Sequence, residues 1–127
     1  MSDREMLGLA AESIGLPECG WMGESFMYVK DNTWAFWNPL EDDGDAFRLA
    51  AACGLAVIPY PIHAQPKHSV IAKRYGESLP LYRGEVKSVE VIEPYGYEGD
   101  PAAATRRAIT RAAAAIGAEI QRNRGAA

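Results

Sequence analysis

The segment from Trp34 to Gly54 constrains the fold of this chain most, because it changes from strand character to helix character within a few residues. It reads Trp-Ala-Phe-Trp-Asn-Pro-Leu-Glu-Asp-Asp-Gly-Asp-Ala-Phe-Arg-Leu-Ala-Ala-Ala-Cys-Gly. Its aromatic start favours a strand, which the Asn38-Pro39 turn ends. Acidic residues then precede an apolar repeat that stops at Gly54, which predicts a helix over residues 44–53.

Similar patterns predict the other elements. Ser2 and Glu5 match a capping box, and Asp100-Pro101 is typical of a helix start. The predicted helices cover 3–14, 44–53 and 101–122. The predicted strands cover 25–29, 33–37, 55–60, 69–73 and 85–92; the first two form a hairpin, and 55–60 lies near the centre of the sheet. Loops are predicted over 16–23 and most of 62–84. Strands and helices do not alternate strictly. We therefore expect one α+β domain over residues 1–127, with three helices and a largely antiparallel sheet of about four to five strands.

Charge and composition narrow the classes of partner. The chain has 127 residues, a net charge of -4 and an ordinary apolar fraction of 48%. Its overall field repels nucleic acid and anionic membranes. This charge disfavours nucleic acid as a partner, unless a local basic patch overrides it. No apolar run is long enough to span a bilayer, so we expect a cytoplasmic protein with no membrane partner.

The cysteines and histidines do not predict a metal site. Cys19, Cys53, His63 and His68 show no compact ligand spacing, so we expect no metal and no cofactor. Cys53 is expected to be a small buried residue and Cys19 a loop thiol. Both histidines lie among prolines and are expected in surface loops.

The acidic cluster from Glu41 to Asp45 does not fit a known catalytic or calcium-binding pattern. An EF-hand register built on Gly44 would need ligands at Pro39 and Ala50, and hydrolytic carboxylate pairs come from opposite sides of a cleft. We expect Asp42 or Asp43 to cap the helix while the neighbouring acids complement its dipole. In the alternative, Asp43 or Asp45 accepts a hydrogen bond from a ligand, or serves a nucleotide-processing enzyme. The prediction is a protein that is not an enzyme.

Arginines mark the start of the last helix. Arg107 and Arg111 are four residues apart and share one face of the helix, and Arg106 directly precedes Arg107 in the sequence. Such a set most often forms a solvated helix face. The alternative is an anion site, because guanidinium groups beside a first helical turn add to its positive dipole, and the Thr105 hydroxyl lies in the same turn.

The aromatic strand supplies a second chemistry. Alternation places Trp34 and Phe36 on one face and Trp37 on the other. One face packs the core, and an exposed face would suit a nucleobase or the apolar anchor of a partner, unless helices cover both. The predicted ligand-binding residues are therefore Trp34, Trp37, Asn38, Asp43, Asp45, Thr105, Arg106, Arg107 and Arg111.

The sequence also resembles a group of phage proteins. The run Trp37-Asn-Pro-Leu-Glu-Asp-Asp-Gly-Asp-Ala-Phe-Arg-Leu-Ala resembles the signature W-N-P-L-x-D-D-G-D-A-x-R-L-A of small accessory proteins of tailed temperate phages, and residues 104–117 are similar to their closing helix. The element order is more distantly similar to the NinX-like phage proteins. The resemblance extends from Leu7 to Arg122 and is weakest over Ile62–Gly84.

This resemblance implies an accessory gene of a phage or prophage, expressed in a bacterial cytoplasm and dispensable for building the virion. The group has no agreed activity, but small phage proteins of this kind often counter host defence. We expect a binding protein that sequesters a small anionic, nucleotide-like ligand. The alternative is a protein that occludes a host or phage protein through the acidic surface of Glu41–Asp45. Small residues over Ala112–Ala115 would also allow a homodimer through the last helix.

Overall fold

The computed structural model describes residues 1–16, 18–60, 68–74, 88–96 and 99–126. Its elements are α1 (Asp3–Ser13), β1 (Gly20–Met22), β2 (Ser25–Lys30), β3 (Thr33–Phe36), α2 (Asp43–Cys53), β4 (Ala56–Tyr60), β5 (Ser69–Arg74), β6 (Val89–Pro94) and α3 (Pro101–Ala126). The predicted α+β class is confirmed. The described strands form two separate antiparallel sheets, ordered β1-β2-β3 and β4-β5-β6, instead of the single sheet expected.

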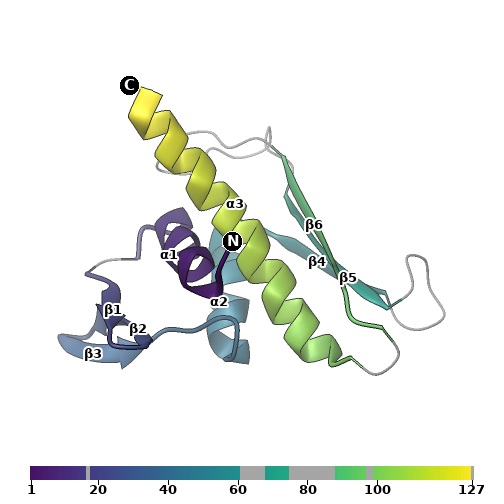
Figure 1. The fold of residues 1–127 in the computed structure, drawn as a ribbon, viewed down its shortest axis with the longest axis horizontal. Helices are drawn as coiled ribbons and strands as arrows, with labels where there is room; N and C mark the ends of the chain where they lie inside the picture. The colour runs from purple at the N-terminus through teal and green to yellow at the C-terminus, as the bar shows by residue number, and fades with distance from the viewer. Residues whose placement is uncertain (17, 61–67, 75–87, 97–98, 127) are drawn as a thin grey trace.

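Helix α3 lies between two layers. In Figure 1, α1 and α2 pack on one side of α3 and the β4-β5-β6 sheet lies on the other. Toward the sheet α3 presents small residues such as Ala108, which pack on Val70 and Ala72, and toward the other helices it presents larger ones such as Ile116. Ala112, Ala113 and Ala114 are all buried inside the chain. The small residues that would allow a homodimer are therefore packed inside one molecule, Ala113 in the core shared with α1 and α2 and Ala112 against the β4-β5-β6 sheet.

The β1-β2-β3 sheet alternates as the aromatic pattern predicts. Trp21 pairs with Phe26 across β1 and β2, and both belong to or pack on the main core. The Phe26 ring lies 5.2 Å from the Trp21 ring and 5.6 Å from the Trp37 ring. The expected loop over residues 16–23 is partly wrong, because β1 occupies Gly20–Met22. Its three residues pair with β2 across the two-residue turn Gly23-Glu24, where Gly23 takes a positive φ of 66°.

In the β4-β5-β6 sheet, β4 is not central as expected. Strand β5 lies between β4 and β6, and β4 is at the edge. Ala56 and Pro59 of β4 are exposed. A proline has no N–H to donate, and an edge strand tolerates this because no further strand needs that donor. The predicted strand over 85–92 is found as Val89–Pro94, and residues 85–87 lie outside the described part of the chain.

The helix ends follow the predicted signals closely. Ser2 Oγ accepts from the Glu5 amide at 3.1 Å, Asp42 Oδ2 accepts from the Asp45 amide at 2.8 Å, and Asp100 Oδ1 accepts from the Ala102 amide at 2.9 Å. Gly54 ends α2 in the left-handed region at φ 68°. The cap of the second helix is thus Asp42, which confirms one of the two residues expected.

The cysteine predictions are confirmed and one histidine prediction is wrong. Cys53 is buried and Cys19 exposed. His68 was expected in a surface loop, but it is buried directly before β5 with its ring 6.1 Å from that of Tyr95. The pairing of β5 between two strands draws this residue into the interior. His63 lies outside the described residues.

Candidate functional site

The acidic turn before α2 is held by its own side chains. Asn38 Oδ1 accepts from the Leu40 amide at 3.1 Å, and the Asn38 amide donates to Asp45 Oδ2 at 3.0 Å. The other Asp45 oxygen accepts from Arg48 Nη2 at 2.8 Å. Asp45 is buried, with both carboxylate oxygens engaged. Asn38 and Asp45, both predicted to bind a ligand, therefore fix the shape of the turn.

Arg106 connects this turn to α3. Its Nη1 lies 2.7 Å from Asp43 Oδ1, and its Nε donates to the Leu40 carbonyl at 3.0 Å. Thr105 beside it donates its hydroxyl to the Pro101 carbonyl at 2.7 Å. Both contacts of Arg106 join residues more than sixty positions apart in sequence. The guanidinium is thereby oriented at the junction of α2 and α3.

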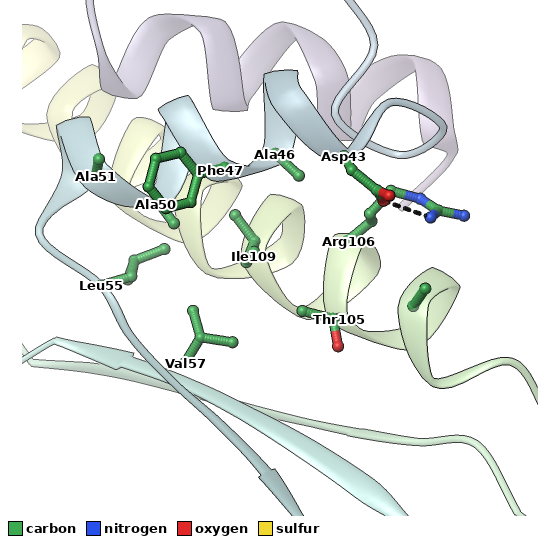
Figure 2. Close-up of a pocket in the computed structure, with 11 residues that line it drawn as sticks. Asp43, Ala46, Phe47, Ala50, Ala51, Leu55, Val57, Thr105, Arg106 and Ile109 are labelled. Carbon is green, nitrogen blue, oxygen red and sulfur yellow. Dashed lines mark hydrogen bonds and ion pairs between the residues drawn. The ribbon is translucent and has the colours of Figure 1, made fainter.

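A cavity of about 530 Å³ opens between α2, the start of β4 and the first half of α3. Figure 2 shows the Asp43–Arg106 ion pair at one end of it, with Thr105 on the same side and apolar side chains, including the Phe47 ring, along the rest. The apolar lining consists of Ala46, Phe47, Ala50, Ala51, Leu55, Val57, Ala102 and Ile109. The cavity therefore has an apolar body and a polar end.

Phe47 is the large aromatic residue among the lining residues that were not predicted from the sequence. Its side chain is 73% exposed although it is a large aromatic ring on α2, and it lies at the cavity in Figure 2. A signal for it was present in the sequence. The core-facing positions of this helix are Ala46, Leu49, Ala50 and Cys53, so a phenylalanine at position 47 is off that stripe and must face something other than the core.

The other two predicted arginines do not line this cavity. Arg111 forms an ion pair with Glu93 of β6 through Oε2, and Arg107 Nε lies 3.7 Å from Glu93 Oε1. Arg107 Nη1 also lies 3.1 Å from Asp3 Oδ1. These pairs join α3 to β6 and to the start of α1. The predicted three-arginine site is divided, and only Arg106 of the three faces the cavity.

The tryptophans are also apart from the cavity. Trp37 is 4% exposed and packs on Phe26 in the main core, and it does not line the α2–α3 cavity. Trp34 is 50% exposed on the β1-β2-β3 sheet, but neither tryptophan is among the described residues that line the α2–α3 cavity. Of the nine predicted binding residues, the structure brings together Asp43, Thr105 and Arg106.

A smaller cavity, of about 310 Å³, lies against the β1-β2-β3 sheet. Asn38, which opens the acidic turn, is among the residues that line it, and two acids and several aromatic residues accompany it. The full lining is Leu7, Trp21, Glu24, Ser25, Phe26, Phe36, Trp37, Asn38 and Glu41. Its chemistry differs from that of the α2–α3 cavity, because its charged groups are carboxylates only.

Over the described ranges, no group of three or more histidine, cysteine, aspartate or glutamate residues is placed to hold a metal ion. In the same ranges, no helix is long and apolar enough to cross a membrane. The chemistry available at the α2–α3 cavity is thus that of one guanidinium, one carboxylate and one hydroxyl beside an apolar wall. The chain matches no protein-family model, no curated protein and no solved structure.

Proposed function

We propose that this protein is a binding module that sequesters a small anionic, nucleotide-like ligand in the α2–α3 cavity. The observation that carries the proposal is the cavity itself. Its volume of about 530 Å³ is in the range of small-molecule sites, which are mostly apolar with a few polar groups that fix orientation. Three of the residues predicted as ligand-binding, Asp43, Thr105 and Arg106, form that polar end.

The two ends of the cavity suit the two parts of such a ligand. A flat base would lie against the Phe47 ring and the aliphatic wall, where apolar burial and stacking favour it. A phosphate or carboxylate would meet Arg106 near the start of α3. A guanidinium has five N–H donors, and the contacts to Asp43 and Leu40 use two of them. The ion pair with Asp43 holds the side chain in place for an incoming anion.

The proposal is for binding without chemical conversion. The polar side chains of the described lining are those of Asp43, Thr105 and Arg106, and Asp43 already faces a guanidinium at 2.7 Å. A carboxylate held in this way serves to position the arginine. The set is suited to recognising an anion, while general base or nucleophilic catalysis would need a second group to activate one of its members.

The biological setting of the proposal comes from the sequence resemblance. Small accessory proteins of temperate phages are made in the bacterial cytoplasm, and a protein of this size that captures a nucleotide signal would counter a host defence that depends on that signal. We therefore propose that the ligand is a signalling nucleotide of the host. The role of Asn38, Asp42 and Asp45 in holding the turn gives the shared motif a structural meaning, because the same turn positions Asp43 at the cavity.

Calorimetry and thermal-shift assays of the purified protein against mononucleotides, cyclic oligonucleotides and ADP-ribose derivatives test this proposal. We expect one class to bind, Arg106→Gln to weaken that binding by about tenfold to a hundredfold, and Phe47→Ser to weaken it as well. Arg111→Gln and Phe36→Ser are matched controls, because both side chains lie outside the cavity. Absence of binding across the panel, or equal losses in the control variants, would contradict the proposal.

A further inference from the structure

The outer face of the β1-β2-β3 sheet is apolar and open. The pairing of Met22 with Ser25, of Met27 with Phe36 and of Val29 with Trp34 places these side chains on one face, opposite the face that packs the core. Met22 is 52% exposed, Trp34 50% and Phe36 71%. Together these three leave on the order of 300 Å² of apolar surface open, the size at which a patch on a single chain is often functional.

The smaller cavity adjoins this face. Phe36 belongs to the open face and also lines the cavity, together with the carboxylate residues Glu24 and Glu41. Among the described residues, neither carboxylate forms an ion pair with a cation, although most other acids near α1, α2 and α3 do. An apolar surface and an acidic cavity are thus contiguous.

The aromatic lining of that cavity is suited to a cation. The guanidinium of Arg4 lies over the Trp21 ring at 4.1 Å from its centre, so one face of this ring already holds a cation in the folded chain. A guanidinium or ammonium group that entered the cavity would meet carboxylates and aromatic rings together, and both attract positive charge. An anion would be repelled by the carboxylates of Glu24 and Glu41.

We propose that this surface binds a protein partner that presents an arginine or lysine side chain beside apolar residues. The basic side chain enters the cavity of Glu24 and Glu41, while the apolar residues cover Trp34 and Phe36. Tryptophan, phenylalanine and methionine are enriched in the centres of interfaces, where they contribute most of the affinity. A second copy of the chain matches less well, because each copy carries a net charge of -4 and like charges oppose association.

This inference is independent of the ligand proposed for the α2–α3 cavity. The two sites share no lining residue. The α2–α3 cavity carries the Arg106 guanidinium, whereas the charged groups of the smaller cavity are the Glu24 and Glu41 carboxylates. Loss of one function can therefore be separated from loss of the other by substitution.

The test uses selection from a random linear peptide library on the immobilised full-length protein, followed by measurement of Kd for the enriched peptides. We expect enriched sequences to carry arginine or lysine next to aromatic or aliphatic residues, and their affinity to fall as salt rises. The combined Glu24→Gln and Glu41→Gln variant should weaken binding about tenfold or more, and Phe36→Ser by about thirtyfold. These side chains are exposed, so the variants are expected to fold.

Matched controls are Glu90→Gln, an exposed acid on β6, and Phe47→Ser, an exposed ring on α2, both of which should bind the peptides as the parent chain does. Enrichment of acidic or purely apolar peptides would overturn the proposal. So would the absence of enrichment, or binding that survives Glu24→Gln, Glu41→Gln and Phe36→Ser together. Sedimentation that shows a dimer dissociated by Phe36→Ser would also overturn it, since a second copy would then occupy the face.

Discussion

At the scale of single residues, the acids of the turn before α2 differ in what they hold. Asp45 is buried and accepts from the Asn38 amide and from Arg48, Asp42 caps α2, and Asp43 is an exposed partner of Arg106. The sequence alone does not distinguish the roles of the four acids Glu41, Asp42, Asp43 and Asp45. Their roles diverge because α2 turns one of them inward and leaves the others near solvent.

This difference predicts a graded effect of alanine substitution on the free energy of unfolding. Asp45→Ala should destabilise most, by about 2 to 3 kcal/mol, because it leaves a backbone N–H without its acceptor. Asp42→Ala should cost about 1 kcal/mol through the lost cap, and Asp43→Ala less than about 1 kcal/mol because its ion pair is solvent-exposed. Urea unfolding of the three variants measures the order, and a larger loss for Asp43→Ala than for Asp45→Ala would contradict the assignment.

The thiol of Cys53 makes the free energy of unfolding vary with pH in the alkaline range. Burial raises its pKa above the ordinary value of 9.0, while a hydrogen bond with Ser13 at 3.3 Å and the charge of Arg74 act in the opposite direction. Because the pKa is higher in the folded chain, the folded state holds the thiol proton more tightly than the unfolded state does. The stability that this difference contributes is fully present below the unfolded pKa. It is lost as pH rises through the folded pKa, since the unfolded chain releases its proton first.

We therefore expect the free energy of unfolding to fall above about pH 9, with a slope of at most about 1.4 kcal/mol per pH unit from this thiol. Cys53→Ala should reduce that slope, whatever its effect at neutral pH. Urea unfolding at several alkaline pH values compares the two chains. Both carry Cys19→Ser, because partial desolvation also raises the pKa of Cys19. Identical pH slopes in the two would show that Cys53 ionises equally in both states.

At the scale of elements, contact between α1 and α3 depends on a glycine. A Cβ atom placed on Gly117 would lie 1.9 Å from the Leu9 carbonyl oxygen, which is backbone and cannot swing aside. The helices can approach this closely only because position 117 has no side chain. The packing of α1 on α3 thus rests on one residue that sequence reasoning read merely as part of a helix.

Gly117→Ala should consequently destabilise the protein by more than about 2 kcal/mol, although alanine is the better helix former. Gly8→Ala in α1 is the matched control, because a Cβ there meets nothing within 4 Å. We expect that control to be neutral or to stabilise by up to about 1 kcal/mol. Thermal melts of both variants provide the comparison, and a neutral Gly117→Ala would mean that α1 and α3 can separate at no cost.

The elements that could be predicted are those whose signals are local. The caps at Ser2, Asp42 and Asp100 depend on neighbouring residues, so the sequence locates the helix starts well. The grouping of strands into two sheets, and the edge position of β4, depend on pairings between distant segments. The same limit applies at the cavity, where Arg106 was found by its charge but its partner Asp43 lies 63 positions away.

At the scale of the whole molecule, α3 joins the two halves of the core. One of its faces packs with α1 and α2 and the other with the β4-β5-β6 sheet, so its small residues serve the interior of a single chain. The separation of Trp34 and Trp37 from Arg106 follows from this arrangement, because the β1-β2-β3 sheet packs beyond α1 and α2 as seen in Figure 1. The sequence identifies the aromatic residues and the arginines, but it does not show that they lie in different parts of the molecule.

The same arrangement predicts where the structure opens first. In the described part of the chain, the β1-β2-β3 sheet packs on the remainder through Phe26, Trp37 and their neighbours on its inner face, whereas the middle of α3 is buried on two sides. Native-state hydrogen exchange should therefore show the amides near Ala112 exchanging only by global unfolding. Amides of β2 and β3 should exchange through a local opening of lower free energy.

The substitution Trp37→Leu gives this expectation a sharper form. It reduces the contact of the inner sheet face with the core and should lower the opening free energy of β2 and β3 by more than that of α3. Phe36→Ser, on the outer face of the same sheet, removes no core contact and should leave both nearly unchanged. Equal protection of β2 and α3 in the parent chain, or an equal fall in both for Trp37→Leu, would show instead that the two halves unfold as one unit.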